Sequence, residues 1–295
     1  MRHPSESWDL ERQALLYVAL GPRSRWGDGG GGMTLGFSVN TLLPKARGGG
    51  QLRMGLTKLS GEEWLQPQPD LAARAAGFAD YPQGVQLTSE AEAPGRELAA
   101  MLGVTGALPE AALAVHEDLC LITQADGDDA YRLIGAAVAW SSDWHPAEKI
   151  GLPLRALHAP IAGYEEQLAS GVERFMATLR AGQIYGRANW FIAATGERRW
   201  LADKPPQEAF AHVAPDNAGE TLFVRSERQT LRRLPQTGAI LFTIGIYVEP
   251  LGKLSPANIA MLAHAVQSLV QGEGDRRGAP AYAANLIAFA QRNAI

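Results

Sequence analysis

Cysteine is almost absent from this chain, and its scarcity excludes several classes of site. Cys120 is the single cysteine among 295 residues, so the chain alone can form no internal disulfide and no Cys-rich zinc or iron–sulfur site. Long apolar runs are also missing, because none approaches the ~18 residues that a membrane span needs. The first residues, MRHPSESWDLERQ, are polar and charged, unlike a secretory signal peptide. We therefore expect a soluble, cytoplasmic protein.

A strong excess of charge of one sign is missing as well. The chain has 27 Lys and Arg against 31 Asp and Glu, which gives a formal net charge of −4, and no block of like charge stands out. This pattern argues against a broad nucleic-acid surface. Hydrophobic residues make up 46% of the chain, which is typical of a globular protein with a sizeable core. We expect neither nucleic acid nor membrane as a partner.

Glycine is abundant in the N-terminal part. Residues 1–50 are expected to form an irregular extension, with a candidate strand at 15–20 and glycine clusters at 27–32 and 48–50. The first cluster fits the G-x-G-x-x-G pattern of dinucleotide sites, but such a site needs a strand before it and a helix after it. Residues 33–39 are strand-like instead, so we interpret the cluster as a flexible loop or hairpin.

Residues 51–295 are expected to form a single α+β domain. Runs of β-branched and aromatic residues predict strands, and apolar residues at helical spacing predict helices. The expected strands are residues 119–123, 131–140, 189–194, 222–226 and 239–248. The expected helices are residues 61–65, 71–78, 97–102, 108–113, 146–158, 164–179, 256–270 and 281–291. This order predicts a central antiparallel sheet with flanking helices on one side or at its ends.

Histidines are the residues in this chain best suited to bind a metal. They are His3, His116, His145, His158, His212 and His264. None forms a close ligand pair such as H-E-x-x-H, so a cofactor with one protein ligand fits better than a zinc site. Haem is such a cofactor, because it needs one axial imidazole, an apolar pocket and basic groups for two propionates. Pro160 should end a helix at about His158, which is either the axial ligand or a helix-terminal histidine favoured by the dipole.

An arginine-rich segment precedes the most apolar strand. Residues 225–233 contain four arginines and Glu227. In a helix, Arg228 and Arg232 would share one face, and arginine forks suit carboxylates and phosphates. A solvated helix with salt bridges is the alternative. If Glu227 is buried, its carboxylate could receive the ammonium group of a substrate.

Acidic residues stand before the first expected strand. Glu117 and Asp118 could divide acid and base roles, but we favour hydrogen bonds from these carboxylates to backbone amides at the strand end. Glu148 and Lys149 lie in an otherwise apolar helix. Cys120 lies among apolar strand residues, so we interpret it as a small core residue and not as a thiolate ligand or nucleophile.

Five segments of the chain carry a resemblance to a known family. They are residues 54–56 with Trp64, 117–121, 144–160, 187–190, and 227–235 continuing into 242–244. In this order and spacing they resemble the haem-dependent oxidative N-demethylase family, of the type of the dimethylamine monooxygenase alpha subunit. The resemblance covers about residues 51–252, and the first fifty residues and the C-terminal helices lie outside it.

The resemblance implies a fold, a cofactor and a reaction. It implies a PAS-like antiparallel sheet that holds haem b, with dioxygen as the oxidant. A methyl group would leave a secondary amine as formaldehyde. Electrons would come from NADPH through a separate reductase subunit that carries FMN and an iron–sulfur cluster. The single cysteine and the lack of a convincing dinucleotide motif agree with electrons supplied by a partner.

The resemblance also implies roles for particular residues. His158 is the expected axial ligand, and His116, where the family commonly has glutamine, is its rival. Arg187 and Arg228 are expected to anchor the propionates, and Lys149 is a further candidate.

Glu227 is expected to contact the substrate amine, with an ion pair to Arg225 or Arg228 as the alternative. Two other functions stay open on the sequence alone. One is a haem-based sensor or gas-binding protein without turnover, and the other is a divergent member that binds no haem.

Overall fold

A computed structural model of the protein describes residues 35–45, 53–124, 127, 130–161, 163–269 and 273–293. The candidate strand at 15–20 and the glycine clusters at 27–32 and 48–50 lie outside these residues. The strand predicted at 33–39 is wrong in its described part, because residues 35–38 have no regular structure and helix α2 (Val39–Leu42) begins at Val39. Ser38 favours that helix because its hydroxyl accepts the Thr41 N–H at the helix N-terminus.

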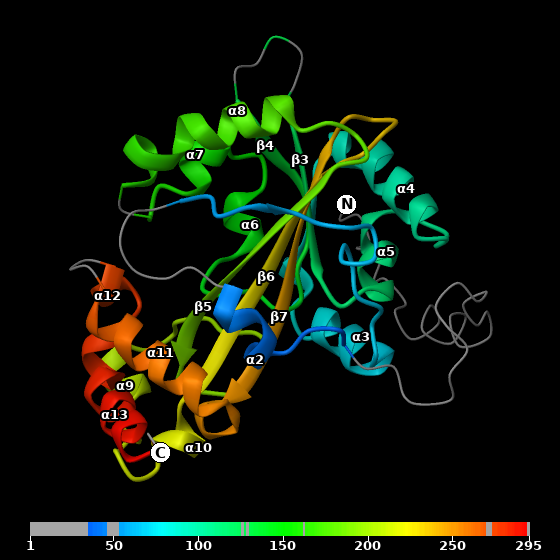
Figure 1. Ribbon diagram of the computed structural model, residues 1–295. Helices are drawn as coiled ribbons and strands as arrows, with labels where there is room; N and C mark the ends of the chain where they lie inside the picture. Colours follow the sequence, from blue (N-terminus) through cyan, green and yellow to red (C-terminus); the bar gives the residue numbers. More distant parts are fainter. Residues whose placement is uncertain are drawn as a thin grey trace, which may run out of the picture.

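A seven-stranded antiparallel sheet forms the centre of the described structure (Figure 1), in the order β1-β5-β6-β7-β3-β4-β2. Its strands are β1 (Thr57–Lys58), β2 (Val85–Leu87), β3 (Asp118–Thr123), β4 (Arg132–Ala137), β5 (Ile184–Ala193), β6 (Phe223–Arg233) and β7 (Ile240–Pro250). Every neighbouring pair is antiparallel. The predicted α+β class and the predicted strands at 119–123, 131–140, 189–194, 222–226 and 239–248 are therefore confirmed, with shifted ends.

The arginine-rich segment is where the fold departs most from the sequence prediction. A helix over residues 225–233 is wrong, because these residues continue β6 and pair with β5 on one side and β7 on the other. Successive side chains of a strand point to opposite faces, so Glu227 and Arg228 lie on different faces of the sheet. Both sets of side chains are polar here, which conceals the two-residue period in the sequence.

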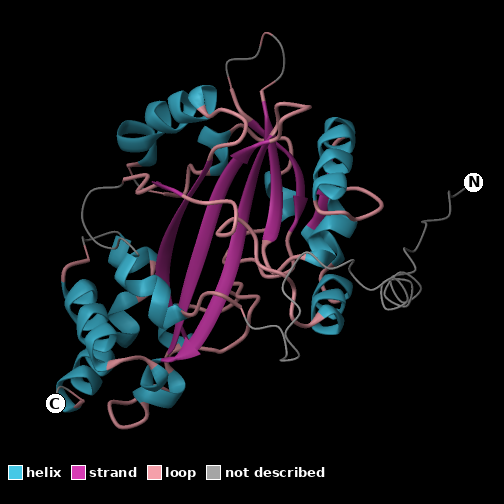
Figure 2. Cartoon of the chain, turned by 45° about the vertical axis from the view of Figure 1, so that its right-hand side comes forward, coloured by secondary structure: helices cyan, strands magenta, loops and turns pink. Residues whose placement is uncertain are grey.

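Helices cover both faces of this sheet and one of its ends, rather than one side alone (Figures 1 and 2). The main helices are α3 (Leu71–Ala79), α4 (Glu92–Met101), α5 (Leu108–Ala114), α6 (Pro146–Lys149), α7 (Leu154–Leu157), the π-helical turn η4 (Glu165–Ala169), α8 (Ser170–Thr178), α9 (Pro206–Ala209), α10 (Ala218–Thr221), α11 (Pro256–Gln267), α12 (Glu273–Arg276) and α13 (Ala279–Arg292). Shorter 3-10 turns are η1 (Leu43–Lys45), η2 (Pro82–Gly84), η3 (Ser89–Ala91) and η5 (Leu251–Lys253).

Two of the predicted helices have a different form. Residues 61–65 make a turn and not a helix. The helix predicted over 146–158 is two short helices, α6 and α7. Gly151, with a φ of 78°, and Pro153 interrupt it, because neither a left-handed φ nor a proline fits inside an α-helix.

Three hydrophobic clusters hold these layers together. On one face, α3, α4 and α5 pack against Leu119, Leu121 and Leu241. On the other face, α7 and α8 pack against Cys120, Leu231 and Ile240. We call this second side of the sheet, with Tyr185, Arg187, Glu227 and Leu231, the α7–α8 face. A third cluster joins α2, α11 and α13 to Trp190 and Val224 on the opposite face, at the far end of the long strands.

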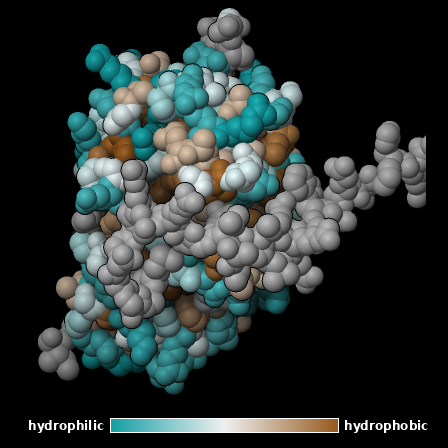
Figure 3. All heavy atoms as spheres, turned by 90° about the vertical axis from the view of Figure 1, so that its right-hand side faces the viewer, coloured by the Kyte–Doolittle hydropathy of each residue, from teal (hydrophilic) through white to brown (hydrophobic). Residues whose placement is uncertain are grey.

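Polar side chains dominate much of the visible surface. In the space-filling view of Figure 3, hydrophilic residues predominate at the top and bottom of the face shown. Among the described residues, Leu71 and Leu87 are the large apolar side chains that stand exposed. Of the helices that the structure describes, none has both the length and the apolar character needed to cross a bilayer.

Candidate functional site

His158 lies directly after α7, on the α7–α8 face of the sheet. Its Nδ1 lies 2.8 Å from the Leu154 carbonyl oxygen. Because a carbonyl oxygen can only accept, Nδ1 carries the hydrogen and Nε2 keeps its lone pair. The imidazole ring also stacks on the ring of Tyr164, with centroids 4.5 Å apart and planes 13° from parallel. The side chain is thereby held with Nε2 accepting no hydrogen bond from the residues that the structure describes.

The electrostatic environment keeps His158 neutral. Burial lowers its pKa, and the cations Arg187 and Lys149 lower it further, against the opposing effect of the hydrogen bond to Leu154. A neutral imidazole with a free nitrogen is the form that binds a metal. Its other N–H donates to a carbonyl, which is the usual way in which a ligating histidine is oriented.

Two cations accompany His158. Arg187 extends from β5 and donates to the Gln229 side-chain oxygen at 2.8 Å and to the Met54 carbonyl at 3.2 Å. Lys149 ends α6, with its Nζ 3.4 Å from the Leu157 carbonyl. The structure therefore brings together three of the residues singled out in the sequence, from three separate elements.

A cavity of about 370 Å³ is lined in part by Met54, the residue whose carbonyl accepts from Arg187. Arg53, Met54, Gly55, Leu56, Phe175 and Tyr185 line it. Phe175 from α8 and Tyr185 from β5 meet edge to face, with ring centroids 5.2 Å apart. The walls are mostly apolar and the cations lie at the margin, a combination that suits an apolar ligand bearing anionic groups.

Glu227 belongs to the same face of the sheet and has amide partners. Asn189 and Gln229 both donate to its Oε2, at 3.1 and 3.0 Å. Since Arg187 also binds Gln229, a continuous polar row runs from Arg187 to Glu227. Within the described residues, neither Arg225 nor Arg228 forms an ion pair with Glu227, so the carboxylate is held by neutral donors.

Arg228 does not join this group. Its side chain lies on the opposite face of β6, where it donates to the carbonyls of Trp64, at 3.2 Å, and Glu63. It stacks over Phe37 at 4.2 Å and lies 3.7 Å from a carboxylate oxygen of Glu117. These partners belong to the far side of the sheet from His158.

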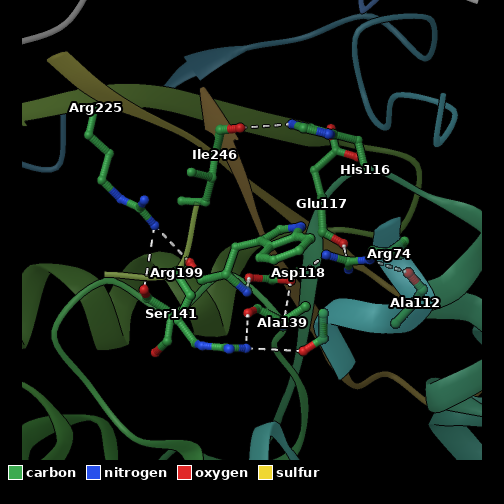
Figure 4. A network of polar contacts seen from close by, with 12 residues as sticks. Arg74, Ala112, His116, Glu117, Asp118, Ala139, Ser141, Arg199, Arg225 and Ile246 are labelled. Atoms are coloured by element: carbon green, nitrogen blue, oxygen red, sulfur yellow. Dashed lines mark hydrogen bonds and ion pairs between the residues drawn. The ribbon is translucent and has the colours of Figure 1, made fainter. Parts of the chain in front are cut away.

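His116, the rival ligand, is fully buried (Figure 4). Its Nε2 donates to the Ile246 carbonyl at 3.0 Å, and its ring packs against Tyr247 on the opposite face. Burial, together with Arg74 and Arg198, lowers its pKa to about 3. Nδ1 has no hydrogen-bond partner among the described residues.

The acidic pair before β3 has the structural role that the sequence favoured. Asp118 accepts from the amides of Ala139 and Trp140, each at 2.9 Å, and from Arg74 at 2.7 Å (Figure 4). Both oxygens of Glu117 accept from the Gln66 amide. Burial raises the pKa of Glu117 to about 7, against the lowering effects of its amide bonds and of Arg228 and Arg74.

Cys120 is also a core residue, as predicted. It is buried on β3, and burial together with Asp118 raises the pKa of its thiol. The side chain is therefore a neutral thiol and not a thiolate.

Sequence reasoning assigned no role to Tyr164, Asn189 or Gln229, all of which contact a candidate residue. Only the register of β5 on β6, which pairs Asn189 with Glu227 and Arg187 with Gln229, brings the amides to the carboxylate. The alternation Arg225-x-Glu227-x-Gln229 is the one sequence signal that could have indicated it, as a strand with a polar face.

Comparison with known protein families identifies the family of this chain. A family model described as "Haem-dependent oxidative N-demethylase, alpha subunit-like" matches residues 78–286, or 209 of the 295 residues. The match begins later than the resemblance seen in the sequence and, contrary to that reading, includes the C-terminal helices α11 and α12 and part of α13. It also contains His158, Arg187 and Glu227. The chain therefore belongs to the haem-dependent oxidative N-demethylase alpha subunit-like family.

Proposed function

We propose that this chain binds haem b on a PAS-like sheet and removes a methyl group, as formaldehyde, from a secondary amine. The observation that carries the proposal is the orientation of His158: its Nδ1 donates to the Leu154 carbonyl, its Nε2 accepts no hydrogen bond from the described residues, and Arg187 and Lys149 are close enough to lower its pKa. Haem, when bound, would supply the oxidation chemistry with dioxygen. The chain's own residues would bind the cofactor, orient the amine and exclude water.

The donor set on the α7–α8 face fits haem chemically. An axial ligand needs one imidazole nitrogen, which His158 offers, and two propionates need cations, which Arg187 and Lys149 offer. Phe175, Tyr185 and their apolar neighbours suit the body of a macrocycle. Arg228 is left out of this assignment because it lies on the other face and already binds two carbonyls.

Glu227 is proposed to receive the substrate amine. Both amide donors reach Oε2, whereas Oε1 accepts no hydrogen bond from the described residues. The side-chain oxygen of Asn189 is buried and also lacks a partner there. A secondary ammonium has two N–H groups and a positive charge. The two N–H groups match the two acceptors, Glu227 Oε1 and the Asn189 side-chain oxygen, and the positive charge matches the carboxylate. Oε1 is also positioned to take a proton from the ammonium before oxidation.

A separate reductase is proposed as the source of electrons, with NADPH, FMN and an iron–sulfur cluster on that partner. The family description as an alpha subunit supports a multi-subunit enzyme. The single cysteine supports it too, since this chain alone cannot ligate a cluster through cysteines.

Haem reconstitution tests the proposal directly. The purified chain is titrated with haemin, and the absorption spectrum is followed without and with dimethylamine as the probe. We expect a Soret band in the wild type and in His116→Gln, and its loss or strong weakening in His158→Ala. Formaldehyde should form when a chemical reductant, dioxygen and the amine are added.

Each alternative has its own result. Retention of haem by His158→Ala with loss in His116→Gln would reverse the ligand assignment. A Soret band without amine-dependent formaldehyde would favour a sensor or gas-binding protein, and no Soret band in the wild type would favour a member that binds no haem.

A further inference from the structure

Tyr164 contacts the face of the His158 ring, and no other role is assigned to it. The two rings are nearly parallel, 13° apart, with centroids separated by 4.5 Å. Offset stacking at this distance is the favourable geometry for two aromatic rings. The side chain of Tyr164 is 4% exposed, so the contact is formed inside the protein and not at its surface.

The backbone around Tyr164 is built in an unusual way. Tyr164 immediately precedes η4, the π-helical turn that leads into α8. Such turns are rare and are often found at functional sites, because the extra residue per turn redirects the side chains beside it. Here the turn lies where the chain passes α7, the helix that carries His158.

Ion pairs of one arginine join α7 to η4 and α8. Arg155 on α7 donates to both carboxylate oxygens of Glu173 on α8, each at 2.8 Å, and it also pairs with Glu165 in η4. A bidentate arginine–carboxylate pair restricts orientation as well as distance. α7 and the start of α8, and with them His158 and Tyr164, are therefore held in a defined relation.

The two contacts on His158 restrict different motions. The hydrogen bond to Leu154 selects the tautomer and holds one edge of the ring, whereas the stack opposes rotation of the ring out of its plane. Burial, with a contribution from Glu173, raises the pKa of Tyr164 to about 12, so the phenol stays neutral and protonated.

We propose that Tyr164 is a positioning residue that holds the His158 imidazole in one orientation, with Nε2 presented to the haem pocket. This inference rests on the proposed function. It attributes the effect to the aromatic ring and not to the hydroxyl, so phenylalanine should replace tyrosine whereas leucine should not.

The test compares Tyr164→Phe and Tyr164→Leu after haem reconstitution. An aromatic pair changes an equilibrium constant by roughly 2- to 12-fold, so haem should dissociate faster from Tyr164→Leu by about that factor. The electron paramagnetic resonance g values of the ferric protein, which report the plane of an axial imidazole, should shift in the leucine variant and match the wild type in the phenylalanine variant. Tyr131→Leu, at a buried tyrosine of the hydrophobic cluster that also contains Leu154, controls for general loosening of the core.

A measurement on the haem-free protein separates this inference from the proposed function. Nitrogen-15 NMR of His158 should show one tautomer in the wild type and in Tyr164→Phe. It should show a mixture in Tyr164→Leu, because a ring that the stack no longer holds can turn away from the Leu154 carbonyl that selects its tautomer. If the wild type binds no haem but these spectra behave as expected, the function fails and the positioning stands. Wild-type g values, haem dissociation and tautomer in a folded Tyr164→Leu would overturn the inference, as would loss of haem from Tyr164→Phe, which would assign the role to the hydroxyl.

Discussion

Glu227 is a single negative charge held on a buried strand by two neutral amides. Asn189 and Gln229 satisfy one oxygen and leave the other to an incoming donor. Arg187 and Arg225 interact electrostatically with this carboxylate without forming an ion pair with it among the described residues, so a cation bound at the second oxygen would give the buried charge a direct partner.

Removal of that charge should weaken the binding of the amine. Glu227→Gln keeps the shape of the side chain, and we expect an unchanged haem spectrum with amine affinity weakened by roughly 10- to 100-fold, the range for a lost charge-assisted hydrogen bond. Titration of the reconstituted protein with dimethylamine, followed by its spectral shift, measures this. Glu220→Gln, an exposed glutamate on α10, is the matched control. An unchanged affinity in Glu227→Gln would leave the residue with a structural role only.

His116 should make stability depend on pH. The pKa of His116 is lowered to about 3 from an unfolded value near 6.5, so the unfolded chain takes up a proton that the folded protein refuses. Its contribution to stability is therefore present above about pH 6.5 and is lost as the pH falls toward 3, with a slope approaching about 1.4 kcal/mol per pH unit. Glu117, whose pKa is raised to about 7, acts in the opposite direction, losing stability as the pH rises from about 4.5 to 7.

The difference between wild type and His116→Gln isolates the histidine. Urea unfolding at pH 4.5, 5.5 and 7.5 should show the wild type losing stability relative to the variant as the pH falls. His264→Gln, at an exposed position on α11, controls for the substitution itself. Parallel pH curves for wild type and His116→Gln would show that His116 takes up its proton equally in both states.

At the scale of elements, β3 is fastened to α3 by a buried ion pair. Arg74 and Asp118 are 0% and 1% exposed in their side chains. Arg74 also donates to the carbonyls of Ala112 and Glu117, so one guanidinium joins α3, α5 and the start of β3.

Breaking this pair should destabilise the whole domain. Arg74→Met leaves the Asp118 carboxylate buried without its cation, and we expect a loss of about 3–5 kcal/mol in the free energy of unfolding. Arg96→Met breaks an exposed pair with Glu92 and should cost less than about 1 kcal/mol. Urea denaturation of both variants measures the contrast, and equal losses would show that burial of the Arg74 pair is not what gives it its strength.

Elements with one apolar face or a continuous apolar run were predictable from the sequence. Residues 119–123 and 239–248 carry such runs, so β3 and β7 were found with small errors at their ends. The start of β6 was predicted at 222–226, but its continuation to Arg233 was not, because polar side chains on both faces conceal a two-residue period that pairing with β5 and β7 stabilises. The break between α6 and α7 had a visible signal in Gly151 and Pro153, which the apolar spacing outweighed.

The alternation of side chains along β6 also decided which parts of the site could be predicted. His158 was identifiable because Pro160 marks the end of its helix. The separation of Arg228 from Glu227 was not, because adjacent residues point apart in a strand and would not be separated in that way in a helix. The contact of Tyr164 with His158 could not be predicted, because it depends on how η4 passes α7. That is a tertiary feature with no local sequence pattern.

At the scale of the whole molecule, the sheet divides two kinds of chemistry between its faces. The α7–α8 face carries His158, Arg187 and Glu227, together with Phe175 and Tyr185 of the cavity wall. The opposite face carries Arg228 and Glu117 in contacts that are already satisfied by carbonyls and amides. β6 contributes alternate residues to both, so one strand links the proposed haem pocket to the structural core.

Substitution of the two arginines, one on each face of the sheet, should therefore affect haem binding differently. Arg187→Gln removes a propionate partner, and we expect haem to dissociate roughly 10- to 100-fold faster, the range for a charge-assisted hydrogen bond. Because Arg187 also donates to the Gln229 side chain and the Met54 carbonyl, the free energy of unfolding should fall by about 1–3 kcal/mol as well. Arg228→Gln leaves the Trp64 and Glu63 carbonyls without their hydrogen-bond donor, so the free energy of unfolding should fall by about 1–3 kcal/mol. Haem affinity should stay close to that of the wild type. Haem transfer to apomyoglobin and urea denaturation, run on both variants, separate the two effects. As part of a strand, Arg228 points away from the α7–α8 face, whereas in a helix over 225–233 it could have pointed toward it. Faster haem loss from Arg228→Gln than from Arg187→Gln would therefore contradict the division of the sheet into these two faces.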